Sequence, residues 1–145
     1  MSIQAAFQHR YDDFKLNVDV SLPAIGVSVL FGHSGSGKTT LLRCIAGLER
    51  ASQGFLTVGE DCWQDSRKNF FRPPYQRAVG YVFQEANLFP HLTVQGNLNY
   101  GFKRKLSNTK MSLDGIIQLL DIEKLLTRFP EHLSGGEKQR VAIAR

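Results

Sequence analysis

The chain has 145 residues, of which 42% are hydrophobic, and this length is enough for one domain with an apolar core. Its 18 basic and 13 acidic residues give a net charge of +5, spread along the sequence apart from Lys103-Arg104-Lys105. No aromatic platform for stacking bases accompanies that trio and no apolar run approaches the ~18 residues of a membrane span, so neither a nucleic-acid partner nor a transmembrane segment is expected.

The first predicted elements are two strands. Phe14, Leu16, Val18, Val20 and Leu22 alternate with polar or small residues, which is the period-two pattern of a half-buried strand, and Pro23 closes it. Residues 27–31, Val-Ser-Val-Leu-Phe, form a short apolar run that predicts a buried strand.

A glycine-rich loop follows and fits the phosphate loop of nucleotide-binding proteins at every position. Its residues are Gly32, His33, Ser34, Gly35, Ser36, Gly37, Lys38 and Thr39. Glycines adopt backbone conformations closed to residues with a Cβ, so that successive N–H groups can turn inward and hold phosphate oxygens. The loop therefore predicts a nucleoside triphosphate ligand, with His33 at a variable position and without a catalytic role.

A helix is predicted from Lys38 to Ala46, and its first residues add chemistry to the loop. The free N–H groups at its start face the same phosphates. Lys38 brings a positive charge to the β- and γ-phosphates, the Thr39 hydroxyl suits one position around Mg²⁺, and Thr40 completes the nucleotide-binding set. Cys44 lies on the apolar side of this helix and is expected to be buried. Neither it nor Cys62 has metal-ligand spacing, which fits a reduced cytoplasmic setting.

The rest of the chain predicts two more strands and then mainly helices. The expected strands are residues 54–58 and the buried-type run 78–83, with an irregular connection over 62–75, where Pro73 and Pro74 stand. Helical spacing of apolar residues covers 94–100, 113–120 and 122–126.

Two motifs in this second half separate the possible phosphate-loop classes. Gln84 ends the second buried-type run, where its side-chain carbonyl can reach Mg²⁺ or an attacking water; the simpler interpretation is a polar residue at a strand end. Ser134, Gly135, Gly136 and Glu137 open a helix with a hydroxyl and two glycines, which makes a second anion site. A capping box of Ser134 and Glu137 explains the same residues, and both interpretations can hold.

With these three motifs in this order, the sequence resembles the nucleotide-binding subunit of ATP-binding-cassette (ABC) transporters over essentially its whole length. Within the family it is most similar to the ATP-binding subunit of bacterial molybdate importers, through residues 77–84, 88–91, 96–101 and 133–143. Subunits of sulfate, iron and polyamine importers share much of the pattern. A phosphoryl-transferring kinase is disfavoured, because it leaves Ser134 to Gln139 unexplained.

The resemblance implies an α/β phosphate-loop fold of the ABC type: N-terminal antiparallel strands, a core sheet with helices, and a helical subdomain near residues 90–133 within one domain, 1–145. It also implies an ATPase that binds ATP and Mg²⁺ as a head-to-tail dimer, with Ser134 to Gly136 reaching the partner's nucleotide. Lys38 and Gln84 are the candidate catalytic residues, and Thr39 and Gln84 the candidate metal ligands. Tyr11 is the candidate for stacking on adenine, with Phe14 as the competitor and an ordinary strand-end aromatic as the simpler interpretation.

Further expectations concern partners and location. The resemblance implies membrane permease subunits as partners, a periplasmic solute-binding protein indirectly, and a peripheral position on the cytoplasmic face of the bacterial inner membrane. The segment after Gln84, with Leu88, Phe89, Pro90 and Leu92, is either a docking surface or ordinary core.

The family pattern continues beyond Arg145. The parts expected there are a central strand ending in the Mg²⁺-orienting aspartate, the glutamate that positions water, and a histidine that senses the γ-phosphate. Asp121 and Glu123 lack a preceding apolar strand and do not replace them. The chain by itself is therefore expected to leave Val27, Val29 and Phe31 partly exposed, to be marginally stable or self-associated, and to bind nucleotide at most. The alternative function is an inactive nucleotide-binding or dimerisation module.

Overall fold

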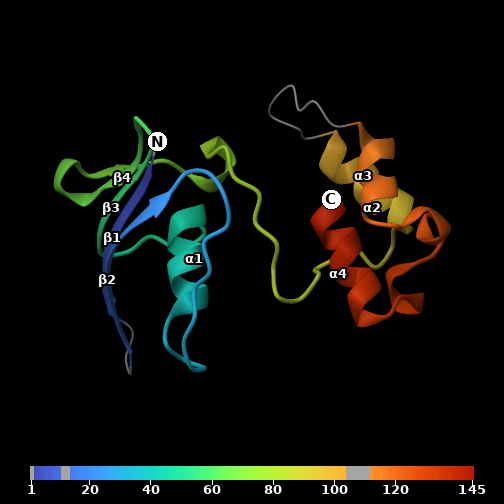
Figure 1. Cartoon of the computed structure of the whole chain (residues 1–145), viewed down its shortest axis with the longest axis horizontal. Helices are drawn as coiled ribbons and strands as arrows, with labels where there is room; N and C mark the ends of the chain where they lie inside the picture. The colour runs from blue at the N-terminus through green and yellow to red at the C-terminus, as the bar shows by residue number, and fades with distance from the viewer. Residues whose placement is uncertain (1, 11–13, 104–111) are drawn as a thin grey trace. The chain divides into compact units, whose positions relative to one another are not determined.

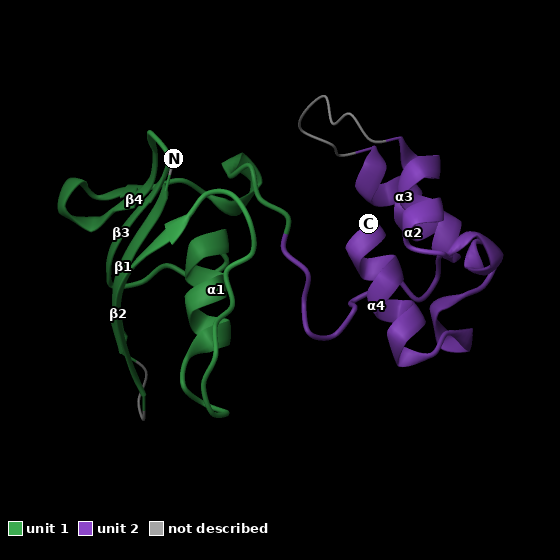
Figure 2. Cartoon of the chain, viewed as in Figure 1, with its two compact units in different colours: residues 1–80 green, residues 81–145 purple. Residues whose placement is uncertain are grey.

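A computed structural model describes residues 2–10, 14–103 and 112–145 of the chain. The chain divides into two compact units, residues 1–80 and residues 81–145, drawn in different colours in Figure 2. No helix among the described residues has the length and apolar character needed to cross a membrane.

Unit 1 is an antiparallel sheet with one helix. Its strands are β1 (Ser2–Arg10), β2 (Lys15–Pro23), β3 (Gln53–Val58), β4 (Asp61–Asp65) and β5 (Phe70–Phe71), in the order β2-β1-β3-β4-β5. The helix is α1 (Lys38–Ala46), and the short 3₁₀ turns are η1 (Ser66–Lys68) and η2 (Pro74–Gln76). In Figure 1, α1 lies against one face of the sheet.

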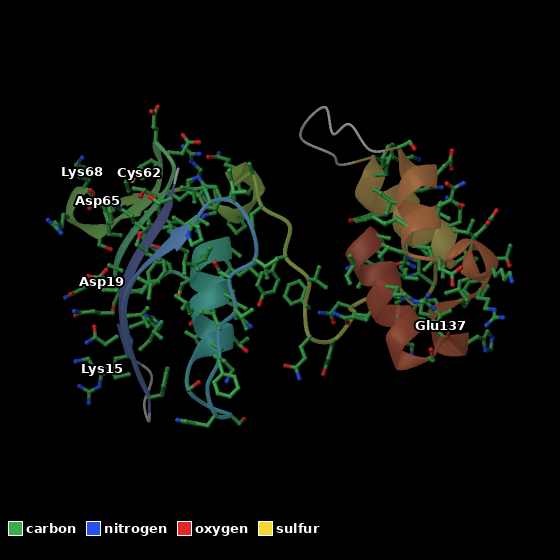
Figure 3. The ribbon with its side chains drawn as sticks, viewed as in Figure 1. Lys15, Asp19, Cys62, Asp65, Lys68 and Glu137 are labelled. Carbon is green, nitrogen blue, oxygen red and sulfur yellow. The ribbon has the colours of Figure 1, made fainter. Side chains whose placement is uncertain are left out.

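Alternation of side chains decides which face of the sheet is covered. Along β1, Ala5 and Phe7 point to the core, and their partners on β2 are Val20 and Val18. The opposite face carries the polar alternates, among them Lys15 and Asp19, which point away from α1 in Figure 3. The core lies between the sheet and α1 and is built from Ala5, Phe7, Leu16, Leu41, Cys44, Ala51, Leu56 and Trp63.

Glycines at both ends set the length of α1. Gly37 before the helix has φ 89° and Gly47 after it has φ 77°, both in the left-handed region that favours glycine. The N–H of Gly47 donates to the main-chain oxygen of Cys44 at 3.1 Å and closes the helix in the usual C-terminal motif. The helix therefore has the bounds expected from the sequence.

Unit 2 is helical. It contains α2 (Val94–Phe102), α3 (Leu113–Leu119) and α4 (Gly135–Ala144), with 3₁₀ turns η3 (Glu123–Leu125) and η4 (Pro130–His132). A separate core joins the helices, made of Val94, Leu98, Ile117, Ile122, Leu125, Leu133 and Val141. Each helix begins at a hydroxyl residue whose side chain accepts from an N–H of the first turn, namely Thr93, Ser112 and Ser134.

Several sequence expectations are confirmed by these elements. The strand with alternating apolar residues is β2, the strand predicted at 54–58 is β3, and helices start where expected at Val94, Leu113 and just after Ser134. Cys44 is fully buried, as predicted from its place on the apolar side of α1.

The prediction of buried strands at residues 27–31 and 78–83 is wrong. Both segments run as irregular backbone, and Val27, Val29 and Phe31 are 91%, 81% and 99% exposed. A strand covered on both faces needs hydrogen-bonded neighbours, and no strand within the described residues pairs with either segment. Apolar character alone does not make a strand when the pairing partner is lacking.

Two smaller predictions also fail. Part of the expected irregular connection over residues 62–75 is ordered as β4, η1, β5 and η2, because β3 offers a free edge on which β4 pairs with a bulge between Leu56 and Thr57. Residues 122–126 form only the 3₁₀ turn η3, since Asp121 has φ 48° and breaks the helical path before them.

Candidate functional site

The phosphate loop is closed by its own lysine. The ammonium group of Lys38 donates to the main-chain oxygens of Gly32 and His33 at 2.9 and 2.7 Å, and its Nζ lies 3.3 Å from Ser36 Oγ. The side chain thus turns back from the first residue of α1 across the loop that precedes it. This arrangement holds one positive charge at the mouth of the loop, where phosphates would lie.

Two glycines allow the loop to make this turn. Gly35 and Gly37 have φ 79° and 89°, and a Cβ on Gly37 would lie 2.6 Å from Phe14 Cζ. A side chain there would face both the strained backbone conformation and the aromatic ring. The ring of Phe14 also packs against the core of unit 1, so this competitor for the adenine contact lies behind the loop.

The start of α1 presents further polar groups. The first N–H groups of a helix have no acceptor within it, and at Gly37 no side chain among the described residues caps them. Thr39 is exposed, Thr40 and Ser36 are half-buried, and Ser34 is exposed. The ring nitrogen Nδ1 of His33 lies 2.8 Å from Ser34 O, which directs this side chain to the loop backbone. The start of α1 therefore has N–H groups that suit an anion, next to the exposed hydroxyl of Thr39.

Gln84 and the segment after it belong to unit 2. Gln84 is exposed on irregular backbone. Farther along, Leu88 packs against the core of unit 2, Phe89 and Leu92 are half-buried, and Pro90 is exposed. Tyr11, the candidate for stacking on adenine, lies outside the described residues.

The second anion site stands at the start of α4, which Figure 3 marks with Glu137. The N–H of Ser134 donates to Glu137 Oε2 at 2.7 Å, and the N–H of Glu137 donates to Ser134 Oγ at 3.3 Å, so the predicted capping box is present. Gly135 and Gly136 are exposed beside it. The hydrogen bonds from the Ser134 backbone and then its side chain, with weaker help from Arg128 and Arg140, hold the pKa of Glu137 below its usual range.

Two buried polar residues near these sites escaped sequence analysis. Asn97 on α2 is fully buried: its Oδ1 accepts from the N–H of Phe89 at 2.8 Å, and its Nδ2 donates to the main-chain oxygens of Phe89, Leu92 and Thr93 at 3.1, 3.2 and 3.0 Å. Arg77, which is 1% exposed, lies at the end of α1. Neither residue stands out in the sequence: Asn97 has polar Gln95 and Asn99 close to it, and Arg77 stands between Gln76 and Ala78.

No group of three histidine, cysteine, aspartate or glutamate side chains in the described part of the chain could hold a metal ion.

The chain was compared with known proteins. It is 55% identical over 144 residues to the molybdenum import ATP-binding protein ModC of Pseudomonas aeruginosa, and 57% identical over 143 residues to that of Methylococcus capsulatus. Each alignment covers 99% of this chain but 40% of the relative, so the chain spans well under half the length of the curated relatives it matches.

Solved structures give the same fold. The dimeric structure of a bacterial ABC transporter cassette aligns with a TM-score of 0.70 at 25% identity, covering 98% of this chain and 67% of the other. A dimeric ATP-binding cassette in a post-hydrolysis state, bound to ADP and phosphate, aligns with a TM-score of 0.72 at 26% identity and the same coverage. The sequence model described as ABC transporter matches residues 16–145. The chain therefore belongs to the ABC transporter family.

Proposed function

We propose that this chain binds ATP through the loop from Gly32 to Thr40. The carrying observation is the position of Lys38, whose Nζ bridges the main-chain oxygens of Gly32 and His33 at the uncapped start of α1. A fixed charge, inward N–H groups and a helix N-terminus converge there on one anion. The nucleotide complex of a similar cassette supports this assignment.

The chain is a part of the ATP-binding subunit of an importer, and its solute is molybdate. The support is that relatives sharing more than half of its residues are named molybdenum import ATP-binding proteins. Sulfate, iron and polyamine are the alternative solutes. In the whole protein, ATP hydrolysis would drive uptake at the cytoplasmic face of the membrane.

Mg²⁺ is the proposed metal, held by the hydroxyl of Thr39 and the side-chain oxygen of Gln84. The exposed hydroxyl at the second position of α1 fits a cation that binds oxygen ligands and phosphates together. When bound, Mg²⁺ neutralises charge on the phosphates. Gln84 and Lys38 are the catalytic residues of the proposal, and Tyr11 the adenine contact.

The proposed partners are a second cassette and membrane permease subunits. Ser134, Gly135 and Gly136 would contact the nucleotide of the other cassette, and the capping box that orders Ser134 leaves the two glycine N–H groups pointing out of the helix start. A similar cassette is a dimer in two of its solved structures, which supports this arrangement. The segment after Gln84 would meet the permease, and a periplasmic solute-binding protein takes part only through it.

For the 145 residues alone we propose binding without turnover. The acidic candidate Asp121 follows α3 and Glu123 opens η3, and the described residues of unit 2 contain no strand that could end at either carboxylate. A nucleotide-binding or dimerisation module without hydrolysis is thus the second candidate function.

Calorimetric titration of the purified chain with Mg-ATP tests the proposal. Saturable binding that is lost in Lys38→Ala and kept in Lys68→Ala supports it. Lys68 is an exposed lysine whose Nζ lies 3.9 Å from Asp65 Oδ2. Circular dichroism must show that all three proteins are folded. Equal binding by the two variants would contradict it.

A further inference from the structure

Arg77 places a positive charge in the interior of unit 1. It is 1% exposed, and its Nη2 has no hydrogen-bond partner among the described residues. Burial, followed by the charge of Arg72, lowers its pKa. Burying a guanidinium costs free energy unless hydrogen bonds and ring contacts replace its contacts with water. The contacts of Arg77 therefore show which parts of the fold it connects.

The contacts of Arg77 join three parts of unit 1. Its Nη1 donates to the main-chain oxygens of Cys44 and Ile45 at 3.0 and 2.6 Å, in the last turn of α1. Its Nε donates to Arg72 O at 2.8 Å, just after β5. The guanidinium also lies over the rings of Trp63 and Phe71, with Cζ 5.6 and 5.0 Å from their centroids.

Close packing at the end of α1 leaves this side chain little freedom. A Cβ on Gly47 would lie 2.6 Å from both Cζ and Nε of Arg77, so the glycine is required for the guanidinium to reach the helix end. The interaction is also electrostatically favourable, because a cation lies at the negative end of the helix dipole.

Along the chain, α1 and Arg77 lie between the two proposed nucleotide-contacting segments, the phosphate loop and Gln84. The first turn of α1 is the end of the phosphate loop, and its last turn holds the guanidinium of Arg77. Gln84 follows Arg77 by seven residues, and Val79 N donates to Arg77 O at 2.9 Å. The side chain of Arg77 therefore connects the last turn of α1 to the backbone that leads toward Gln84.

We infer that Arg77 is a positioning residue that ties the segment leading to Gln84 to the C-terminal end of the phosphate-loop helix. The inference deepens the proposed function and rests on it, because it needs nucleotide at the loop. A purely structural cap would stabilise unit 1 but would leave the response of the Gln84 segment to nucleotide unchanged.

A fluorescent probe beside Gln84 separates the two roles. Glu85 is exposed, so Glu85→Cys in a Cys62→Ser background gives one reactive thiol, while Cys44 is fully buried. The labelled chain is titrated with Mg-ATP while calorimetry measures the dissociation constant. We expect a saturable probe response in the parent and its loss in Arg77→Lys, with the dissociation constant unchanged, because lysine keeps the charge but lacks the planar fork that reaches three carbonyls and two rings.

Controls keep each outcome decisive. Arg72→Lys, whose side chain bonds the exposed Asp61, should retain the full probe response. If Arg77→Lys does not fold by circular dichroism, Phe71→Leu takes its place, and a response equal to the parent's then overturns the inference. A full response in folded Arg77→Lys overturns it too, as does a silent probe in a parent that binds. Absence of binding by calorimetry instead removes the proposed function, and the inference with it.

Discussion

The Lys38 side chain reaches back to Gly32, with Nζ donating to the main-chain oxygen at 2.9 Å. Five residues lie between Gly32 and Lys38, so the lysine joins the two ends of the loop while its charge stays at the loop. The side chain that would meet the phosphates is therefore also the one that shapes their site.

Lys38→Ala should weaken Mg-ATP binding by at least about tenfold, because a hydrogen bond to a charged group contributes about 1.5–3 kcal/mol. The measurement is isothermal titration calorimetry, with Lys68→Ala as the matched exposed lysine. An affinity within error of the parent's would refute the role given to Lys38.

Gly37→Ala should destabilise unit 1 and remove nucleotide binding. The new Cβ would lie 2.6 Å from Phe14 Cζ at a φ of 89°, a conformation that costs an alanine about 1–3 kcal/mol. Urea unfolding followed by circular dichroism gives the loss in free energy of unfolding. Gly80→Ala is the control, since a Cβ there meets nothing within 4 Å, and it should unfold like the parent.

Asn97→Ala should lower the stability of unit 2 by about 1–3 kcal/mol, because it leaves the part-buried N–H of Phe89 without its acceptor. Amide hydrogen exchange should then rise in residues 88–93 before it rises elsewhere in unit 2. Asn99→Ala, on the exposed side of α2, should change neither quantity. If exchange rose evenly over unit 2 in both variants, with no earlier rise in residues 88–93, Asn97 would not be the residue that holds this segment in place.

The start of α4 should depend on pH through Glu137. Its pKa is depressed in the folded chain, so its stabilising contribution is complete above the unfolded pKa and is lost as pH falls through the folded pKa. In Glu137→Gln the amide oxygen can still accept from Ser134 N–H but does not titrate over this range. Thermal unfolding measured at a series of acidic pH values should therefore show the parent's advantage over this variant shrinking with falling pH. A constant difference would rule out the carboxylate.

Exposed apolar side chains in residues 25–31 should make the chain self-associate. Val29 and Phe31 are 81% and 99% exposed, next to Ile25 and Val27 on the same segment. Sedimentation velocity should show a concentration-dependent increase in mass, reduced in the double variant Val29→Thr with Phe31→Ser. A monomer at all concentrations that unfolds cooperatively would be evidence against this expectation and against marginal stability.

Secondary structure could be predicted correctly wherever it depends on the residues of a single segment. Alternation predicted β2, the spacing of apolar residues predicted the starts of α2 and α3, and Ser134 predicted the start of α4. The phosphate loop could be predicted because each of its glycines permits an unusual conformation of its own backbone. The strand predictions for residues 27–31 and 78–83 were wrong, because a strand needs a neighbouring strand to pair with and an apolar run alone does not reveal one.

The candidate site also contains residues that the sequence predicted and residues that only the structure revealed. Lys38 was predicted to face phosphates from the motif alone, but its bonds to Gly32 and His33 required the fold. Arg77 and Asn97 became visible only through their contacts. Each holds the main chain of residues distant from it in sequence, and side-chain bonds of that kind leave no periodic pattern.

The family, the phosphate loop and the start of α4 could be predicted from the sequence, because backbone conformation and helix capping depend on consecutive residues. The pairing of the apolar runs and the buried arginine at the end of α1 emerged only in the folded chain. Those outcomes depend on which surfaces meet, and the free energy of such contacts belongs to pairs of segments rather than to either one alone.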